Sequence, residues 1–334
     1  MKLKTILTAL TAVLLSSVTE VKAQVKFMDY KTSTLEEVLK KAQAEHKNVF
    51  IDIWTPWCGV CKMMDRWVFP RKDVGDYFNK NFINLSFDAE NPKWVAAAKK
   101  FNATAFPTML IVNPQGEVIM NIDNLGVPME SDATGATSPV GQRLMQQAGL
   151  AQSLVTMPDT AFLSKQTVST LRQLSPAFDT KVFGRIISLK DQFLKQYPNE
   201  FNGIVDDALG TAAVNMVSKS GHVVNTHKAD QYRSIVEALN LPQKQSQLLS
   251  LDLNIAIAMR KWQQVITLAK NNKQAMTPVL YATIMDEMAG SCSDKALLHS
   301  ALTLCKPAVS SASENSRIGK FMKEAYSNLE AASK

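Results

Sequence analysis

The sequence predicts a mixed α/β domain with helices on both faces of its sheet, followed by an all-α domain. Helical and strand-like patterns alternate as far as residue 122, which is typical of such a sheet. Beyond about residue 155 the patterns are helical alone, with polar breaks between segments. The length of 334 residues suits about two domains. We therefore expect a leader at 1–23, an α/β domain at 24–155 and a helical domain at 156–334.

The first 23 residues have the pattern of a secretory signal peptide. Lys2 and Lys4 precede an apolar run from Ile6 to Leu15, and the small residue Ala23 stands at the expected cleavage position. The apolar run is too short to span a bilayer, and no later stretch approaches the roughly eighteen apolar residues of a membrane helix. We expect cleavage after Ala23 and export, most simply to a bacterial periplasm.

Each element of the α/β part has its own local signal. Apolar residues one turn apart predict a first helix at 35–44, with Ser33 or Thr34 as its N-cap. The β-branched and aromatic run 49–54 predicts a strand. The further expected elements are a helix opening at Cys58, a helix around 74–78, a strand at 82–88, a short helix at 93–100, a strand at 109–112 and its hairpin partner at 118–122.

The chain changes composition after the predicted hairpin. Residues 126–141 are rich in Gly, Pro, Ser and Thr, which predicts a long loop, and a helix at about 142–154 would close the domain. In the helical part the phrase Ile266–Lys270 is echoed by Leu302–Lys306, 36 residues later. That spacing suits stacked helical hairpins of the tetratricopeptide kind, and a plain helical bundle stays open as an alternative.

The positive charges of the chain are dispersed. Of the formal net charge of +7, the leader carries +2. Residues 24–150 are neutral, with 14 basic and 14 acidic side chains, and residues 151–334 carry +5, with 20 basic and 15 acidic. A nucleic-acid site would need a basic cluster, and the sequence has no such run. We expect no nucleic-acid partner.

The run from Trp54 to Lys62 places two thiols, Cys58 and Cys61, between a strand and a helix. A thiolate at a helix N-terminus is stabilised by unpaired N–H groups and by the macrodipole, so Cys58 is the expected nucleophile. Cys61 lies one turn later on the same face and can attack a mixed disulfide formed on Cys58. The pattern predicts dithiol–disulfide exchange, with this pair as the redox group and no further cofactor.

A zinc site is the standard alternative for two cysteines at this spacing, and it needs two more ligands. The other cysteines, Cys292 and Cys305, lie in the helical part. The histidines are scattered: His46, His222, His227 and His299. We therefore expect no metal. Cys292 and Cys305 flank a predicted helix of about 18 Å, far beyond the roughly 4.4–6.8 Å between the Cα atoms of a disulfide, and we give them no role.

Several separated features, in the right order, resemble the thioredoxin family over roughly residues 28–124. Asp52 lies six residues before Cys58, where thioredoxins carry a buried aspartate. Trp54 and Trp57 match the pattern W-x-x-W-C-x-x-C, and Phe106-Pro107-Thr108 resembles the family's cis-proline loop. Within the family, the segment from Cys58 to Asp88 is most similar to the thioredoxin-like domains of secreted bacterial thiol reductases. It departs from the family pattern at Val60, Arg66 and Asn84, where thioredoxins carry two prolines and a lysine.

The resemblance implies a role for each of these residues. Cys58 would be the partly exposed attacking thiolate and Cys61 the buried resolving thiol. Desolvation should raise the pKa of Asp52, which could then accept the Cys61 proton through water; a solvent-facing strand position is the alternative for Asp52.

A cis Pro107 would present the Phe106 backbone to an extended substrate and keep metal-binding side chains away from the thiols. Trp54, Trp57, Phe106 and Thr108 would contact the substrate; packing in the core is the alternative for either tryptophan.

The predicted function is exported thiol–disulfide oxidoreductase. Gly59-Val60 places no charge between the thiols to stabilise the reduced form, which favours a reductase of protein disulfides, kept reduced by a membrane electron-transfer partner. A disulfide oxidase or isomerase is the alternative within the same chemistry. In a third interpretation the helical domain binds a client and carries the main role.

Overall fold

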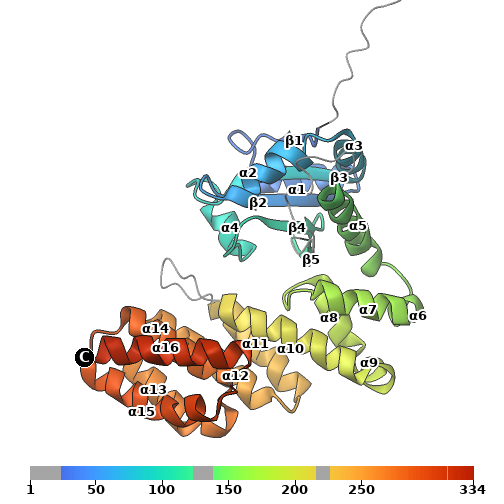
Figure 1. The fold of residues 1–334 in the computed structure, drawn as a ribbon. Coiled ribbons are helices and arrows are strands. Elements are labelled where there is room, and N and C mark those ends of the chain that lie inside the picture. The colour runs from blue at the N-terminus through green and yellow to red at the C-terminus, as the bar shows by residue number, and fades with distance from the viewer. Residues whose placement is uncertain (1–23, 123–137, 216–225, 314) are drawn as a thin grey trace, which may run out of the picture.

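Figure 1 shows an α/β part followed by a helical part. This computed structural model describes residues 24–122, 138–215, 226–313 and 315–334. The predicted signal peptide lies outside the described residues, and so does most of the predicted loop at 126–141. The predicted fold class, a mixed sheet with flanking helices followed by helices alone, is confirmed.

The sheet of the N-terminal part has five strands in the order β1-β3-β2-β4-β5. They are β1 (Phe27–Met28), β2 (Asn48–Trp54), β3 (Phe82–Asp88), β4 (Thr108–Val112) and β5 (Val118–Asn121). The first three run parallel to one another, and β4 is antiparallel to both β2 and β5. The short edge strand β1 was not predicted. The central strand β2 leads directly into the two cysteines.

The helices of the α/β part are α1 (Leu35–Ala44), α2 (Gly59–Met63), the π-helical η1 (Met64–Val68), α3 (Lys72–Asn81), α4 (Val95–Lys100) and α5 (Pro139–Leu154). The N-cap of α1 is Thr34 rather than Ser33, because Thr34 and Glu37 form a reciprocal capping box. Helix α5 begins three residues before its predicted start. Ser138 caps it and Pro139 occupies its first turn, where proline is favourable.

The side chains of β2 alternate between two separate cores. Val49, Ile51 and Ile53 face α1 and α4, in a cluster that includes Val38 and Ala98. The opposite face of the sheet packs against η1, α3 and α5, and this second cluster continues into the helical part through α12. The hydrophobic core therefore runs across residue 155, where we placed the domain boundary.

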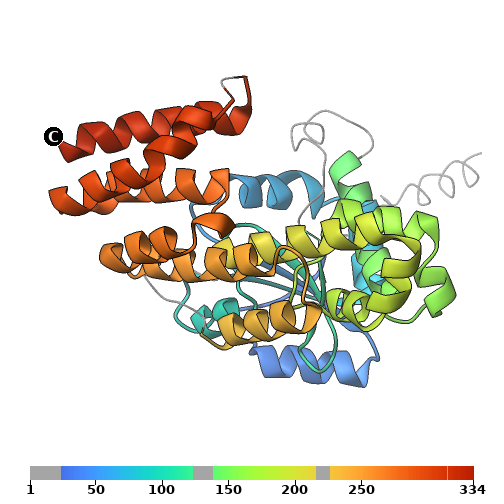
Figure 2. The same ribbon diagram turned by 90° about the horizontal axis from the view of Figure 1, so that it is seen from below.

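The helical part comprises α6 (Asp159–Phe162), α7 (Lys165–Leu174), α8 (Lys181–Ser188), α9 (Lys190–Gln196), α10 (Pro198–Asn215), α11 (Thr226–Leu239), α12 (Lys244–Ala258), α13 (Trp262–Asn271), the 3₁₀-helix η3 (Lys273–Ala275), α14 (Pro278–Ser291), α15 (Lys295–Ser311) and α16 (Arg317–Ser333). A third core cluster joins α12 to α16. The last four helices stack on one another and project to one side of the molecule (Figure 2). The echoed phrases lie on α13 and α15, which pack together. No described helix is both long and apolar enough to cross a membrane.

Candidate active site

Cys58 and Cys61 form a disulfide at the start of α2, directly after β2. Cys58 is the N-cap residue of this helix, as predicted, and its Sγ accepts a hydrogen bond from the backbone N–H of Cys61 at 3.0 Å. The backbone N–H of Cys58 donates in turn to the carbonyl of Thr55 at 3.1 Å, which closes the turn between strand and helix. The turn and the cap together aim a backbone donor at the sulfur of Cys58.

The exposure of the two cysteines differs from the prediction. Cys58 was expected to be partly exposed and Cys61 buried, but both are 4% exposed. The physical reason is the disulfide itself, which holds the sulfur of Cys58 against Cys61. In the disulfide form, exposure does not distinguish the nucleophile, and the helix cap is the feature that singles out Cys58.

Asp52 lies in the central strand β2, on the face of the sheet that packs against η1 and α3. Its side chain is only 2% exposed, which rules out the solvent-facing alternative. Burial raises the pKa of Asp52 to about 7; a hydrogen bond from Ser86 opposes the shift, and the negative charge of Asp65 adds to it. The predicted rise in the pKa of Asp52, with desolvation as its main cause, is confirmed. A carboxyl group with such a pKa can exchange protons near neutral pH.

Ser86 is the residue of this site that sequence reasoning missed. Asn84, which stands where thioredoxins carry a lysine, pairs with Phe50 and donates to Asn79 Oδ1 at 3.2 Å. In the register of β2 against β3 it is Ser86 that lies opposite Asp52, and its hydroxyl donates to Asp52 Oδ2 at 2.8 Å. Asn84 and Ser86 alternate onto the same face of β3, so only the strand register decides between them.

The predicted substrate-binding residues divide into two groups. Trp57 is 65% exposed beside the disulfide, and its ring meets that of Phe106 edge-on at a centroid distance of 5.7 Å. The Phe106–Pro107 peptide bond is cis, as the resemblance implied. The indole Nε1 of Trp57 donates to Glu90 Oε1 at 2.8 Å, a contact that no sequence pattern indicated. Trp57 and Phe106 therefore form one aromatic surface next to the cysteines.

Trp54 and Thr108 are engaged elsewhere. Trp54 packs edge-on against Tyr30 with a centroid distance of 6.0 Å, which agrees with the packing alternative for this tryptophan. Thr108 is 7% exposed, and its hydroxyl donates to the carbonyl of Ala105 at 2.6 Å within the cis-proline loop. Trp54 is thus half-buried beside Tyr30, and the hydroxyl of Thr108 is occupied within the cis-proline loop.

The remaining cysteines are remote from this chemistry. Cys292 and Cys305 are buried free thiols in the third core cluster, and burial raises the pKa of Cys305 to about 12. A thiol with so high a pKa is a poor nucleophile. Within the described ranges, no group of three or more His, Cys, Asp and Glu side chains could hold a metal ion.

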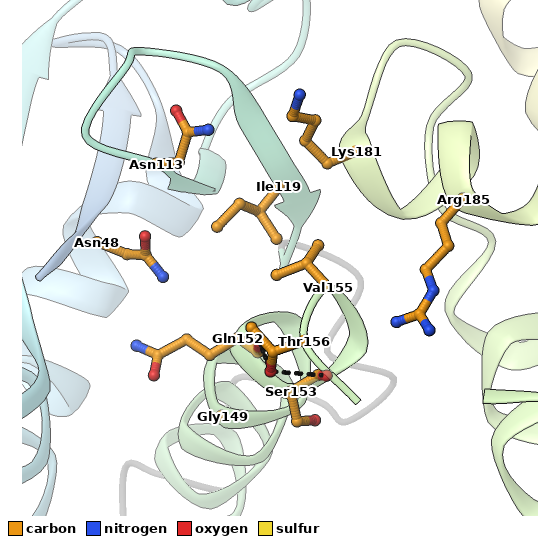
Figure 3. Close-up of a pocket in the computed structure, with 10 residues that line it drawn as sticks. All are labelled: Asn48, Asn113, Ile119, Gly149, Gln152, Ser153, Val155, Thr156, Lys181 and Arg185. Atoms are coloured by element: carbon orange, nitrogen blue, oxygen red, sulfur yellow. Dashed lines mark hydrogen bonds between the residues drawn. The ribbon is translucent and has the colours of Figure 1, made fainter. Parts of the chain in front are cut away.

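A cavity of about 690 Å³ lies beside the end of β2 at which Asn48 begins the strand, and Figure 3 shows ten of the residues that line it. Asn48, which begins β2, and Asn113, which follows β4, line it together with residues of α5 and α8. Arg185 borders the cavity, but its guanidinium donates hydrogen bonds to the carbonyls of Leu154 and Met157, each at 2.6 Å. Because Cys58 follows the other end of β2, this cavity is not part of the cysteine site.

Comparison with known proteins decides the identity of the α/β part. Residues 35–126 match the family described as thioredoxin-like domain. These residues are a thioredoxin-like domain. The predicted membership in the thioredoxin family is therefore confirmed for the part of the chain that carries Cys58, Cys61 and the cis-proline loop.

Curated relatives of the thioredoxin-like domain are thiol:disulfide interchange proteins named DsbD. The protein from Vibrio cholerae is 31% identical over 91 residues, which is 27% of this chain and 15% of the relative. The protein from Yersinia pestis is 32% identical over 79 residues, or 23% of this chain and 13% of the relative. The chain thus spans less than a fifth of the length of either relative.

A solved structure also matches part of the chain. It is a solution structure of a proposed disulphide-isomerase from Bacteroides thetaiotaomicron, with 32% identity and a TM-score of 0.30. The match covers 39% of this chain and 93% of that one. The family match, the interchange-protein relatives and the bonded cysteine pair together support the predicted thiol–disulfide chemistry.

Proposed function

We propose that this protein is an exported oxidoreductase that reduces or exchanges disulfides in protein substrates through Cys58 and Cys61. The observation that carries the proposal is a bonded cysteine pair at a helix N-cap, in a domain whose buried aspartate has a pKa near 7. The relatives named as thiol:disulfide interchange proteins agree with this chemistry.

In the first step the Cys58 thiolate attacks one sulfur of a substrate disulfide. A bond forms between Cys58 and that sulfur, and the other sulfur leaves as a thiolate that takes a proton from solvent. The N–H of Cys61, which points at the Cys58 sulfur, and the N-terminus of α2 both favour the thiolate. The aromatic surface of Trp57 and Phe106 is placed to hold the residues next to the substrate cysteine.

In the second step Cys61 resolves the mixed disulfide. The Cys61 thiol gives its proton to Asp52 through water, and its sulfur attacks the sulfur of Cys58. The bond between Cys58 and the substrate breaks, and the substrate leaves with both of its sulfurs reduced. Two electrons have passed to the substrate, and the Cys58–Cys61 disulfide that remains must be reduced by an external dithiol, for which we propose a membrane electron-transfer partner.

The uncharged Gly59-Val60 pair between the cysteines supports the reducing direction over oxidation or isomerisation. Export to the periplasm and a domain boundary near residue 155 belong to the proposal, and a client-binding protein whose helical part carries the main role is the alternative to it. The ion pair of Glu117 with Lys181, at 2.8 Å, links the helical part to the turn between β4 and β5.

Insulin reduction by the whole chain from residue 24 to residue 334 tests the proposal. We expect turbidity from the reduced insulin chains when dithiothreitol is the electron source, and none above background for Cys58→Ser. The matched control is Cys305→Ser, which removes a buried thiol outside the site and should keep the activity. Wild-type activity no higher than that of Cys58→Ser would overturn the proposal and leave the client-binding interpretation.

A further inference from the structure

The two oxygens of the buried Asp52 carboxyl group have different surroundings. Oδ2 accepts the hydrogen bond from the Ser86 hydroxyl, at 2.8 Å. Oδ1 is also buried, and no described residue gives it a hydrogen bond. A buried oxygen that lacks a donor is the costlier place for negative charge, so protonation at Oδ1 relieves more of the desolvation cost than protonation at Oδ2. A proton on Oδ1 also leaves the Ser86 bond intact.

Few other groups reach this carboxyl. Across the sheet its neighbours are Ser86 in β3 and Met109 in β4, and Met109 has no proton to give. Among the helices that pack on this face of the sheet, η1 carries Asp65, whose negative charge raises the pKa of Asp52. Lys62 of α2 is exposed, and Asp88 at the end of β3 accepts the N–H of Glu90 at 2.9 Å. Ser86 is therefore the hydrogen-bond donor that favours the ionised form of Asp52.

We propose that Ser86 is a positioning residue for the exchange reaction: its hydroxyl holds Oδ2 of Asp52, so that Oδ1 is the atom that takes the Cys61 proton. This inference rests on the proposed function, in which Asp52 is the base for Cys61. When the Cys61 S–H bond breaks, the proton goes to Oδ1 and the sulfur electron pair forms the bond to Cys58. The electron pair of the broken mixed disulfide leaves with the substrate thiolate.

The proposal makes Ser86 a determinant of the pH at which Cys61 becomes reactive. Loss of the hydroxyl removes a bond to the ionised carboxyl, so the midpoint for Asp52 ionisation should move to higher pH. The net free energy of one such hydrogen bond corresponds to a shift of about 0.5 to 1 pH unit in the midpoint of Asp52 ionisation. Ser86→Thr keeps the hydroxyl and should stay near the wild-type midpoint. Asn84→Ala alters the same face of the same strand without touching Asp52 and serves as the matched control.

Two measurements on the full chain test this inference. In stopped flow, reduced protein reacts with 5,5′-dithiobis(2-nitrobenzoate); the first released thiolate reports attack by Cys58 and the second reports resolution by Cys61. The Cys58→Ser/Cys61→Ser variant gives the background from the two buried free thiols. In parallel, ¹³C NMR of labelled aspartate follows the titration of Asp52 in the oxidised protein, with Asp52→Asn to assign its signal.

We expect Ser86→Ala to move both the NMR midpoint and the midpoint of the resolution phase upward, while Ser86→Thr and Asn84→Ala leave both in place. An unchanged NMR midpoint in Ser86→Ala would overturn the inference, and so would an NMR shift without a shift of the resolution phase. Either result can occur with full insulin reduction by the wild-type chain, which separates failure of this inference from failure of the proposed function.

Discussion

Cys58 caps the very helix that contains Cys61, because its Sγ accepts the backbone N–H of Cys61 at 3.0 Å. The hydrogen bond places a backbone donor on the sulfur that the mechanism requires to be a thiolate. Cys61 has no equivalent place in the helix, since it lies within the first turn of α2. The two thiols are therefore chemically unequal although they are equally buried in the disulfide.

This inequality predicts which variant traps substrates. Cys61→Ser should accumulate mixed disulfides through Cys58, because the resolving thiol is gone, while Cys58→Ser should accumulate none. Non-reducing gels of protein mixed with reductively unfolded, re-oxidised substrate measure the adducts. Cys292→Ser, which removes a buried cysteine far along the chain, is the control and should behave as wild type. Equal trapping by the Cys58 and Cys61 variants would contradict the assignment of the nucleophile.

The buried Asp52 should make the free energy of unfolding fall as the pH rises. Its pKa is about 7 in the folded chain against an ordinary 3.8, so between these values the folded state holds a proton that the unfolded state has lost. Stability is therefore lost as the pH rises from about 4 to about 7. Asp52→Asn removes this dependence and should stabilise the oxidised chain by a few kcal/mol at pH 8, an upper figure set by the pKa shift. Urea unfolding at pH 5 and pH 8 measures the free energy of unfolding of the variant and of the wild type. An equal gain in stability at both pH values would contradict the raised pKa of Asp52.

We expect Trp57 to contribute to the binding of protein substrates and not to the reactivity of the thiols. Its ring is exposed beside the cysteines and is held by Glu90 and Phe106. Trp57→Ala should raise the KM for insulin about fivefold to tenfold, the effect of losing one aromatic anchor, with the rate toward a small disulfide within about twofold of wild type. Steady-state and stopped-flow kinetics measure the two quantities. Val279→Ala, another exposed apolar side chain but in α14, should change neither. Equal losses toward both substrates would show that Trp57 acts on the thiols instead.

The shared core predicts that the helical part stabilises the thioredoxin-like domain. Phe183 of α8 is fully buried in the same cluster as Ile119 and Ile122, which belong to β5 and the residue after it. Phe183→Ala should lower the free energy of unfolding by about 3 to 5 kcal/mol. Phe321→Ala, at a position 41% exposed on α16, should lower the free energy of unfolding far less. Chemical denaturation of the two variants compares them, and similar losses would mean that α8 does not support the sheet.

Features that depend on local sequence pattern could be predicted from the sequence alone. The apolar strand before the cysteines predicted that Asp52 would be buried, and the helical spacing after them predicted Cys58 at the helix start. Ser86 could not be chosen over Asn84, because both alternate onto one face and only long-range strand pairing sets the register. Glu90 was missed for a similar reason, since its contact with Trp57 joins two loops 33 residues apart. The continuity of the core across residue 155 is a tertiary feature that no local pattern encodes.

The reduction potential of the Cys58–Cys61 pair decides whether this pair reduces or oxidises protein disulfides. Purified chain from residue 24 to residue 334 is equilibrated with defined dithiothreitol and glutathione mixtures, and the oxidised fraction is read after thiol alkylation. We expect a single two-electron transition near the thioredoxin figure of about −270 mV. A value near the strongly oxidising figure of about −120 mV would contradict the reducing direction, and the absence of any two-thiol transition would contradict dithiol–disulfide exchange itself.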